Sequence, residues 1–248
     1  MKRFNLLCSV LLASLMLAGS ANAQLISEFE PNPAGGDPAD TTFELSGMPS
    51  SSFDLWLLSL ENDGFGGTVD RAANVTGMFD SNGLAVVMVP DLENPSFTVV
   101  LTDSFTGMIG DDLDTAGDGT LDLTSLGTVL DSVGVSDNTA DDSVLYSTIL
   151  GGDSILFNGQ FEPLHVFRDA STGAFYQSVT IDFGEPTERI GIFDANGVEV
   201  SAGDFINGDP LAPTYGAINP TFEPVPEPTS LALLGLTGCV ALARRRRS

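Results

Sequence analysis

Short hydrophobic runs separated by clusters of Gly, Asn, Asp and Pro recur through most of this 248-residue chain. The runs have the length of β-strands, and pairs such as Asn82-Gly83 between them are turn signals. No central stretch reads as a convincing helix. The pattern predicts an all-β protein of about a dozen strands, which favours an immunoglobulin-like β-sandwich. The predicted strands cover residues 25–30, 43–46, 53–60, 74–79, 84–89, 97–101, 128–135, 143–149, 155–157, 164–167, 175–181, 190–193 and 198–200.

Three parts of the central region depart from simple alternation. Residues 53–60, which contain the only tryptophan, Trp56, are hydrophobic at consecutive positions, and this predicts a strand buried on both faces. Residues 107–120 are polar and glycine-rich and predict a loop. Residues 207–224 contain prolines and glycines without periodicity. They predict a stalk that follows a sandwich domain over residues 24–206.

The N-terminus has the layout of a secretory signal peptide. Lys2 and Arg3 are followed by an apolar run over residues 6–18 and by the small-residue site Ala21-Asn22-Ala23. This order predicts an N-terminal signal helix over residues 1–23 that signal peptidase removes after Ala23.

The C-terminus has three parts in a fixed order: a proline-framed acidic motif, an apolar stretch and four arginines. The 15 uncharged residues 229–243 predict a short hydrophobic helix. Its length of about 22 Å falls short of the ~30 Å hydrocarbon core, so it is a marginal membrane span. The arginines would keep the chain end on the cytoplasmic side. The motif is Val225, Pro226, Glu227 and Pro228, and the cytoplasmic anchor is Arg244, Arg245, Arg246 and Arg247.

Residues 225–248 resemble the PEP-CTERM sorting signal. The resemblance implies recognition by an exosortase, transient anchoring in the inner membrane, and delivery to the cell surface or the extracellular matrix. It describes the route of the protein and leaves the work of the delivered domain open.

The charge balance of the central region disfavours nucleic acid as a partner. Residues 24–224 contain 33 acidic residues, three arginines and no lysine, a formal charge of −30. Such a surface repels phosphate backbones, so nucleic acid is not an expected partner. Both cysteines, Cys8 and Cys239, lie in the terminal segments, so the domain is not a disulfide scaffold.

The start of the domain resembles bacterial lamin-tail-like domains. Residues 25–33 read Leu-Ile-Ser-Glu-Phe-Glu-Pro-Asn-Pro, and Phe43-Glu44-Leu45 resembles the strand that follows in that family. The resemblance covers roughly residues 25–150. It implies an immunoglobulin-like sandwich that acts as a surface adhesion or interaction module.

The loop from residue 112 to residue 122 is a candidate calcium site. Read from Asp114, it resembles dockerin and EF-hand loops, with oxygen-bearing residues and a glycine at suitable spacing. Ala116 and Ser125 replace two usual ligands, which predicts weak binding. An acidic solvated loop without an ion is the alternative interpretation. The candidate ligands are Asp112, Asp114, Asp118, Thr120 and Asp122.

Catalytic signals are sparse. The only histidine, His165, falls in the predicted strand 164–167, and no Gly-x-Ser-x-Gly motif or central cysteine supplies a nucleophile. The sequence therefore favours a non-enzymatic surface or matrix protein, calcium-assisted if the loop binds, with exopolysaccharide or surface proteins as partners. The alternative is a secreted glycan-binding module or a carboxylate-dependent glycoside hydrolase, in which Trp56, Tyr146, Tyr176 and Tyr215 could stack on sugars.

Overall fold

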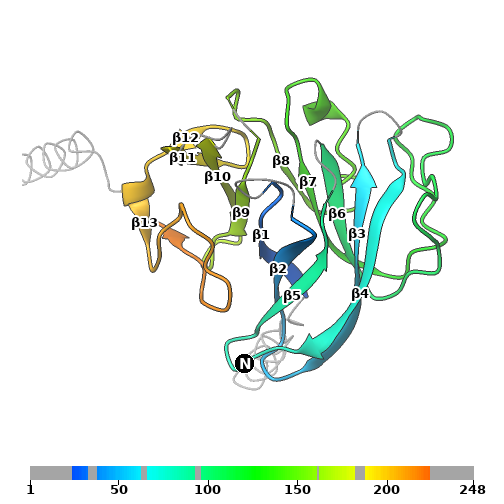
Figure 1. The fold of residues 1–248 in the computed structure, drawn as a ribbon, viewed down its shortest axis with the longest axis horizontal. Coiled ribbons are helices and arrows are strands. Elements are labelled where there is room, and N and C mark those ends of the chain that lie inside the picture. The colour runs from blue at the N-terminus through cyan, green and yellow to red at the C-terminus, as the bar shows by residue number, and fades with distance from the viewer. Residues whose placement is uncertain are drawn as a thin grey trace, which may run out of the picture.

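The computed structural model describes residues 24–32, 38–62, 66–92, 96–160, 162–181 and 188–223. The predicted signal helix over 1–23 and the predicted C-terminal hydrophobic helix lie outside these residues. Within them the chain forms fourteen strands and two short 3-10 helices (Figure 1). These are β1 (Leu25–Phe29), β2 (Asp40–Ser46), β3 (Ser52–Glu61), β4 (Val69–Met78), β5 (Leu84–Pro90), β6 (Phe97–Thr102), β7 (Val129–Val135), η1 (Asp141–Ser143), β8 (Asp153–Ile155), β9 (His165–Arg168), β10 (Phe175–Ile181), β11 (Glu188–Asp194), β12 (Glu199–Val200), η2 (Ala202–Asp204), β13 (Phe205–Ile206) and β14 (Thr221–Phe222).

Two large sheets account for most of the described strands. One has seven strands in the order β12-β11-β10-β9-β1-β2-β5, and the other has five in the order β4-β3-β6-β7-β8. Phe29 and Phe43 from the first sheet share one core with Leu57 and Leu101 from the second. The two sheets therefore pack face to face, consistent with the predicted all-β sandwich, whereas its immunoglobulin-like and lamin-tail-like character stays a prediction.

The prediction for residues 53–60 is confirmed in the second half of β3. Leu57 faces the core between the sheets, whereas Leu58 and Leu60 belong to a separate cluster on the outer face of the five-stranded sheet. In the first half, Ser52 and Asp54 are exposed, so the strand alternates there. A strand can bury both faces only where something covers its outer face.

That cover is the loop between β6 and β7, residues 103–128, which we call the 103–128 loop. Its Phe105, Leu113 and Leu126 pack on Leu58 and Leu60. Backbone bonds join its middle to the start of β4, including one from the N–H of Val69 to the carbonyl of Asp111 (2.8 Å). Figure 1 shows it beside β3 and β4, at the right of the molecule.

The outer face of the seven-stranded sheet is covered by the C-terminal segment, residues 201–223. Its Phe205 and Phe222 pack edge-on or tilted against Tyr176, with ring centroids 5.0 and 5.4 Å away. The predicted stalk is therefore wrong for residues 207–223, which belong to the folded domain. Figure 1 shows this segment at the left, on the opposite side from the 103–128 loop.

One predicted strand is also wrong. Residues 143–149 form the end of η1 and a series of turns, in which the N–H of Leu150 bonds to the carbonyl of Tyr146 (3.2 Å). Leu145 and Tyr146 are buried, whereas Ile149 is 57% exposed. A hydrophobic run of this length does not distinguish a strand from a packed turn.

Candidate functional site

The acidic loop predicted to bind calcium is folded around Asp114, which is 4% exposed. Its carboxylate accepts hydrogen bonds from the N–H groups of Asp118 (3.0 Å) and Gly119 (2.8 Å) and from the hydroxyl of Tyr146 (2.9 Å). Burial alone would raise the pKa of Asp114, but these hydrogen bonds outweigh burial and hold the pKa below its usual value. Asp114 therefore organises the loop.

The other predicted ligands bond to nearby backbone. Asp112 accepts the N–H of Asp114 (2.9 Å), and Asp118 accepts the N–H of Thr120 (3.0 Å). Asp122 accepts an N–H two residues further on (3.0 Å). Among the described residues, no three His, Cys, Asp or Glu side chains are grouped to hold a metal ion. Calcium takes six to eight oxygens, backbone carbonyls included, and its binding to this loop stays a prediction.

A groove of ≈ 530 Å³ lies between this loop and the turns after η1. Its volume is within the ~300–1,000 Å³ of ordinary ligand sites. The side chain of Asn62, which lines it, already donates to the carbonyl of Val144 (2.7 Å) and accepts from Thr98 (2.8 Å). The groove can therefore admit a ligand, but its lining groups Asn62 and Asp114 already have partners within the protein.

His165 begins β9 and is 2% exposed, so its predicted place in a strand is confirmed. Its Nε2 lies 2.6 Å from Oε1 of Glu28, and its Nδ1 lies 3.4 Å from Oγ of Ser178. A serine, a histidine and an acid have the composition of a catalytic triad. Glu28 and Ser178 are 0% and 1% exposed, however, so a substrate has no access to them while the C-terminal segment is in place.

Glu28 and Glu44 anchor the C-terminal segment to the sheet. Glu28 accepts the N–H of Thr214 (2.6 Å) and lies 3.0 Å from its hydroxyl, and Glu44 accepts the N–H of Gly216 (2.7 Å). These contacts join residues 186 and 172 positions apart. In the sequence, each of the two glutamates lies beside a phenylalanine in a strand, and nothing there indicates Thr214 or Gly216 as its partner.

Glu44, Glu30 and Tyr215 in this region have raised pKa values. Burial raises the pKa of Glu44 to about 7, although the N–H of Gly216 and the hydroxyl of Ser27 lower it. Burial also raises the pKa of Glu30. The pKa of Tyr215 rises through burial and the nearby Glu30 and Glu28. Taking a carboxylate out of water is unfavourable, so the raised pKa values of Glu44 and Glu30 make the stability of this face depend on pH.

The end of the described chain is also anchored. Asp169 Oδ2 accepts the N–H of Phe222 (2.6 Å), and the N–H of Glu223 bonds to the carbonyl of Asp204 (2.7 Å). The side-chain amide of Asn219 donates to the carbonyl of Arg168 (2.9 Å). The fold therefore continues to residue 223.

Arg168, one of three arginines in the central region, links the two large sheets. Its Nη2 lies 2.9 Å from Asp131, which also accepts the N–H of Ile26 (2.8 Å). Its guanidinium lies 4.1 Å from the ring centroid of Phe175. The positive charge of Arg168 is therefore paired within the protein, with Asp131.

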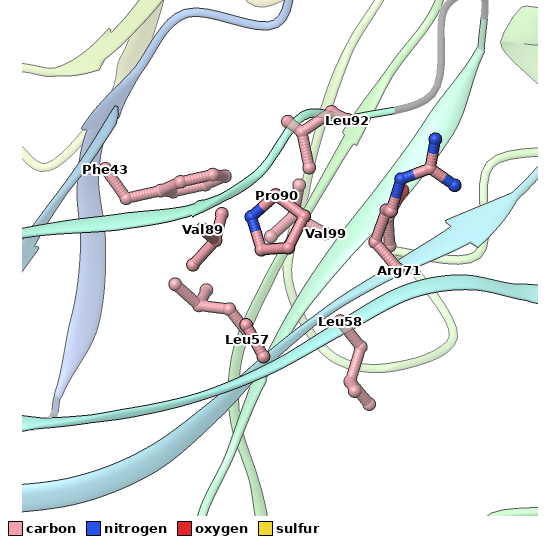
Figure 2. Close-up of a pocket in the computed structure, with 10 residues that line it drawn as sticks. Phe43, Leu57, Leu58, Arg71, Val89, Pro90, Leu92 and Val99 are labelled. Atoms are coloured by element: carbon pink, nitrogen blue, oxygen red, sulfur yellow. The ribbon is translucent and has the colours of Figure 1, made fainter. Parts of the chain in front are cut away.

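A gap at the edge of the sandwich is too small to be a ligand site. Figure 2 shows it between β5, which contributes Val89, and β3 and β4, which contribute Leu57 and Arg71. Its volume is ≈ 10 Å³, about that of a single water site.

The aromatic residues considered for sugar stacking are mostly packed. Tyr146 and Tyr176 are each 7% exposed. Trp56 is half-buried and meets Phe105 edge-on at 5.7 Å between ring centroids. The hydroxyl of Tyr215 bonds to the carbonyl of Thr42 (3.1 Å). Neither Tyr146 nor Tyr176 presents an open platform for a sugar.

Comparison with protein families assigns the tail. Residues 224–247 match the model of the PEP-CTERM protein-sorting motif. The tail is a PEP-CTERM motif. The match includes the predicted motif at 225–228 and the arginines at 244–247, and it implies an exported, exosortase-processed protein with membrane-associated sorting.

No curated protein and no solved structure matched the chain. In the described ranges, no helix is long and apolar enough to cross a bilayer. The apolar stretch 229–243, predicted to anchor the protein transiently, lies outside those ranges.

Proposed function

We propose that the delivered sandwich works at the cell surface or in the extracellular matrix as a non-enzymatic interaction or structural module. Exosortase and signal peptidase are its partners during export, and exopolysaccharide or surface proteins are its partners afterwards. The observation that carries the proposal is the sorting motif joined to an acidic β-sandwich whose last strand ends at Phe222.

The state of the polar side chains supports a non-enzymatic role. His165 and Ser178 are enclosed with Glu28, and Asp114 is occupied by donors from its own loop and by Tyr146. Catalysis needs such groups within reach of a substrate. Calcium is left out of the proposal, because the carboxylates of Asp112, Asp118 and Asp122 each already accept a backbone N–H close by.

Removal of residues 224–248 tests the route. We expect the truncated protein to lose its surface or matrix location, measured by fractionation and immunoblotting of cells that contain the exosortase. Asp118→Ala, which changes an exposed loop residue, is the matched control and should be delivered normally. Normal delivery of the truncated protein would contradict the proposal.

A second candidate is a glycan-binding module or a carboxylate-dependent hydrolase, and the ≈ 530 Å³ groove is the observation that favours it. A glycan array and a hydrolase panel on the exported protein separate the two candidates. Ile149 lines this groove, so binding that Ile149→Asp abolishes would support a glycan-binding module. Turnover in the panel would overturn the non-enzymatic proposal.

A further inference from the structure

β5 is an unprotected edge of the seven-stranded sheet. It has seven residues, none of them charged, and among the described strands it pairs only with β2. Natural edge strands are blunted by shortness, charge or proline. At the other sheet ends, β12 and β8 have two and three residues, and β4 carries Asp70 and Arg71. β5 has only Pro90, at its end.

The backbone of β5 shows which groups point outward. The carbonyl of Gly83 accepts the N–H of Gly47, before β5 begins, on the side of β2. The N–H and the carbonyl of Leu84 point the other way, away from β2, because both bond to Asp80 in the preceding turn (both 2.8 Å). Directions alternate along a strand, so the N–H and carbonyl groups of Val86 and Met88 also point away from β2.

A second copy of β5, running antiparallel, supplies matching groups. With Val87 on the two-fold axis, Val86 of one copy faces Met88 of the other. Such a pair exchanges both of its N–H···O=C bonds, and the axis generates the pair twice. Pro90 has no N–H, and the N–H of Leu84 is already bonded, so this register uses every free outward N–H in the strand.

Side chains and charge agree with this pairing. Val86 is 49% exposed and Met88 is 67% exposed, and in this register each covers the other. The central region carries a formal charge of −30, so two copies repel each other over most of their surfaces. The uncharged β5 edge is where a second copy meets no like charge within the strand.

We propose that this protein forms a two-fold dimer by antiparallel pairing of β5 with β5, which joins the seven-stranded sheets of two copies. This is a contact between copies and does not depend on the proposed function of the domain.

Sedimentation of the exported protein over a range of concentrations tests the dimer. We expect a concentration-dependent dimer that tightens several-fold at high salt, because salt screens the repulsion between acidic domains. Val86→Lys with Met88→Lys places lysines opposite each other and should weaken dimerisation at least about tenfold. Met78→Lys, a methionine equally exposed at 67% but on β4, is the control and should not weaken it. A monomer at all concentrations and salts, or a larger loss with Met78→Lys, would overturn the proposal.

Cysteine cross-linking tests the register and does not rely on a weak equilibrium. Residues 24–223 contain no cysteine, so a single introduced cysteine is unambiguous. Val87→Cys should form a disulfide-linked dimer under mild oxidation, because facing Cα atoms in a non-hydrogen-bonded pair are about 4.5 Å apart. Val86→Cys faces Met88 and should cross-link far more slowly. Equal rates for the two variants would exclude this register and overturn the pairing.

Discussion

The 103–128 loop and the C-terminal segment each cover the outer face of a sheet, but they are held in place by different hydrogen bonds. Each covers the outer face of one sheet with hydrophobic side chains, Phe105 and Leu126 in the loop and Phe205 and Phe222 in the C-terminal segment. Asp114 in the loop accepts hydrogen bonds mainly from its own loop. The C-terminal segment depends instead on Glu28 and Glu44, which are buried in the sheet beneath it.

The comparison shows that a carboxylate is unfavourable where it is buried and not where it is exposed to water. Exposed loop carboxylates such as Asp118 and Asp122 stay in contact with water, in addition to the backbone N–H that each accepts. A carboxylate beneath a cover needs donors in place of water, and Thr214 and Gly216 supply them. We therefore expect the C-terminal segment to respond strongly to changes at its anchors, and the 103–128 loop to respond less.

The largest effect is expected at Glu28. Glu28→Ala leaves His165 and the N–H of Thr214 without their acceptor in a buried site, and should lower the free energy of unfolding by about 3–5 kcal/mol. Urea denaturation measures it. Asp118→Ala, at an exposed position of the 103–128 loop, should change stability by less than about 0.5 kcal/mol. Equal losses of stability for Glu28→Ala and Asp118→Ala would contradict the expected difference between the C-terminal segment and the 103–128 loop.

A smaller effect is expected at Asp114. Asp114→Ala removes the acceptor for Gly119, Asp118 and Tyr146, and should lower the Tm by about 4 °C in a thermal melt. Tyr146→Phe removes one of these bonds and should cost about 1 kcal/mol. If Asp114→Ala destabilised the protein as much as Glu28→Ala, the loop would depend on its acid as strongly as the C-terminal segment does.

Glu44 is expected to make the free energy of unfolding depend on pH. Its pKa is raised to about 7 in the folded protein from an ordinary 4.5, so the folded state favours the protonated form. Its stabilising contribution is full below about pH 4.5 and is lost as the pH rises through about 7, a loss of about 1–2 kcal/mol after allowance for solvent screening. The difference in unfolding free energy between wild type and Glu44→Gln, followed from pH 4.5 to 8, measures it. Glu199→Gln, at an exposed site, should reproduce the wild-type profile.

The smallest effect is expected from calcium. Because Asp112, Asp118 and Asp122 each already accept a backbone N–H, millimolar Ca²⁺ should change the Tm no more than equal Mg²⁺ does. A rise specific to calcium that Asp118→Ala abolishes would restore the loop as a metal site.

Much of the fold could be predicted from local pattern. The strands around Phe53, Phe97 and Phe175 fall where hydrophobic runs meet turn signals, because strand and turn preferences act over a few residues. The local pattern also predicts a strand over residues 143–149, where the chain forms turns, because a short apolar run fits either structure. The anchoring of Thr214 on Glu28 has no local signal, because the two residues are 186 positions apart.

The sequence by itself determined the all-β class, the charge of the central region, and the sorting motif, because each depends on composition or on contiguous residues. Only the tertiary structure decided what happens to the polar side chains. It buried His165 beside Glu28, wrapped the loop around Asp114, and turned a predicted stalk into the cover of a sheet. The physical reason is that burial and hydrogen-bond partners are set by which strands become neighbours, and that follows from pairing over the whole chain.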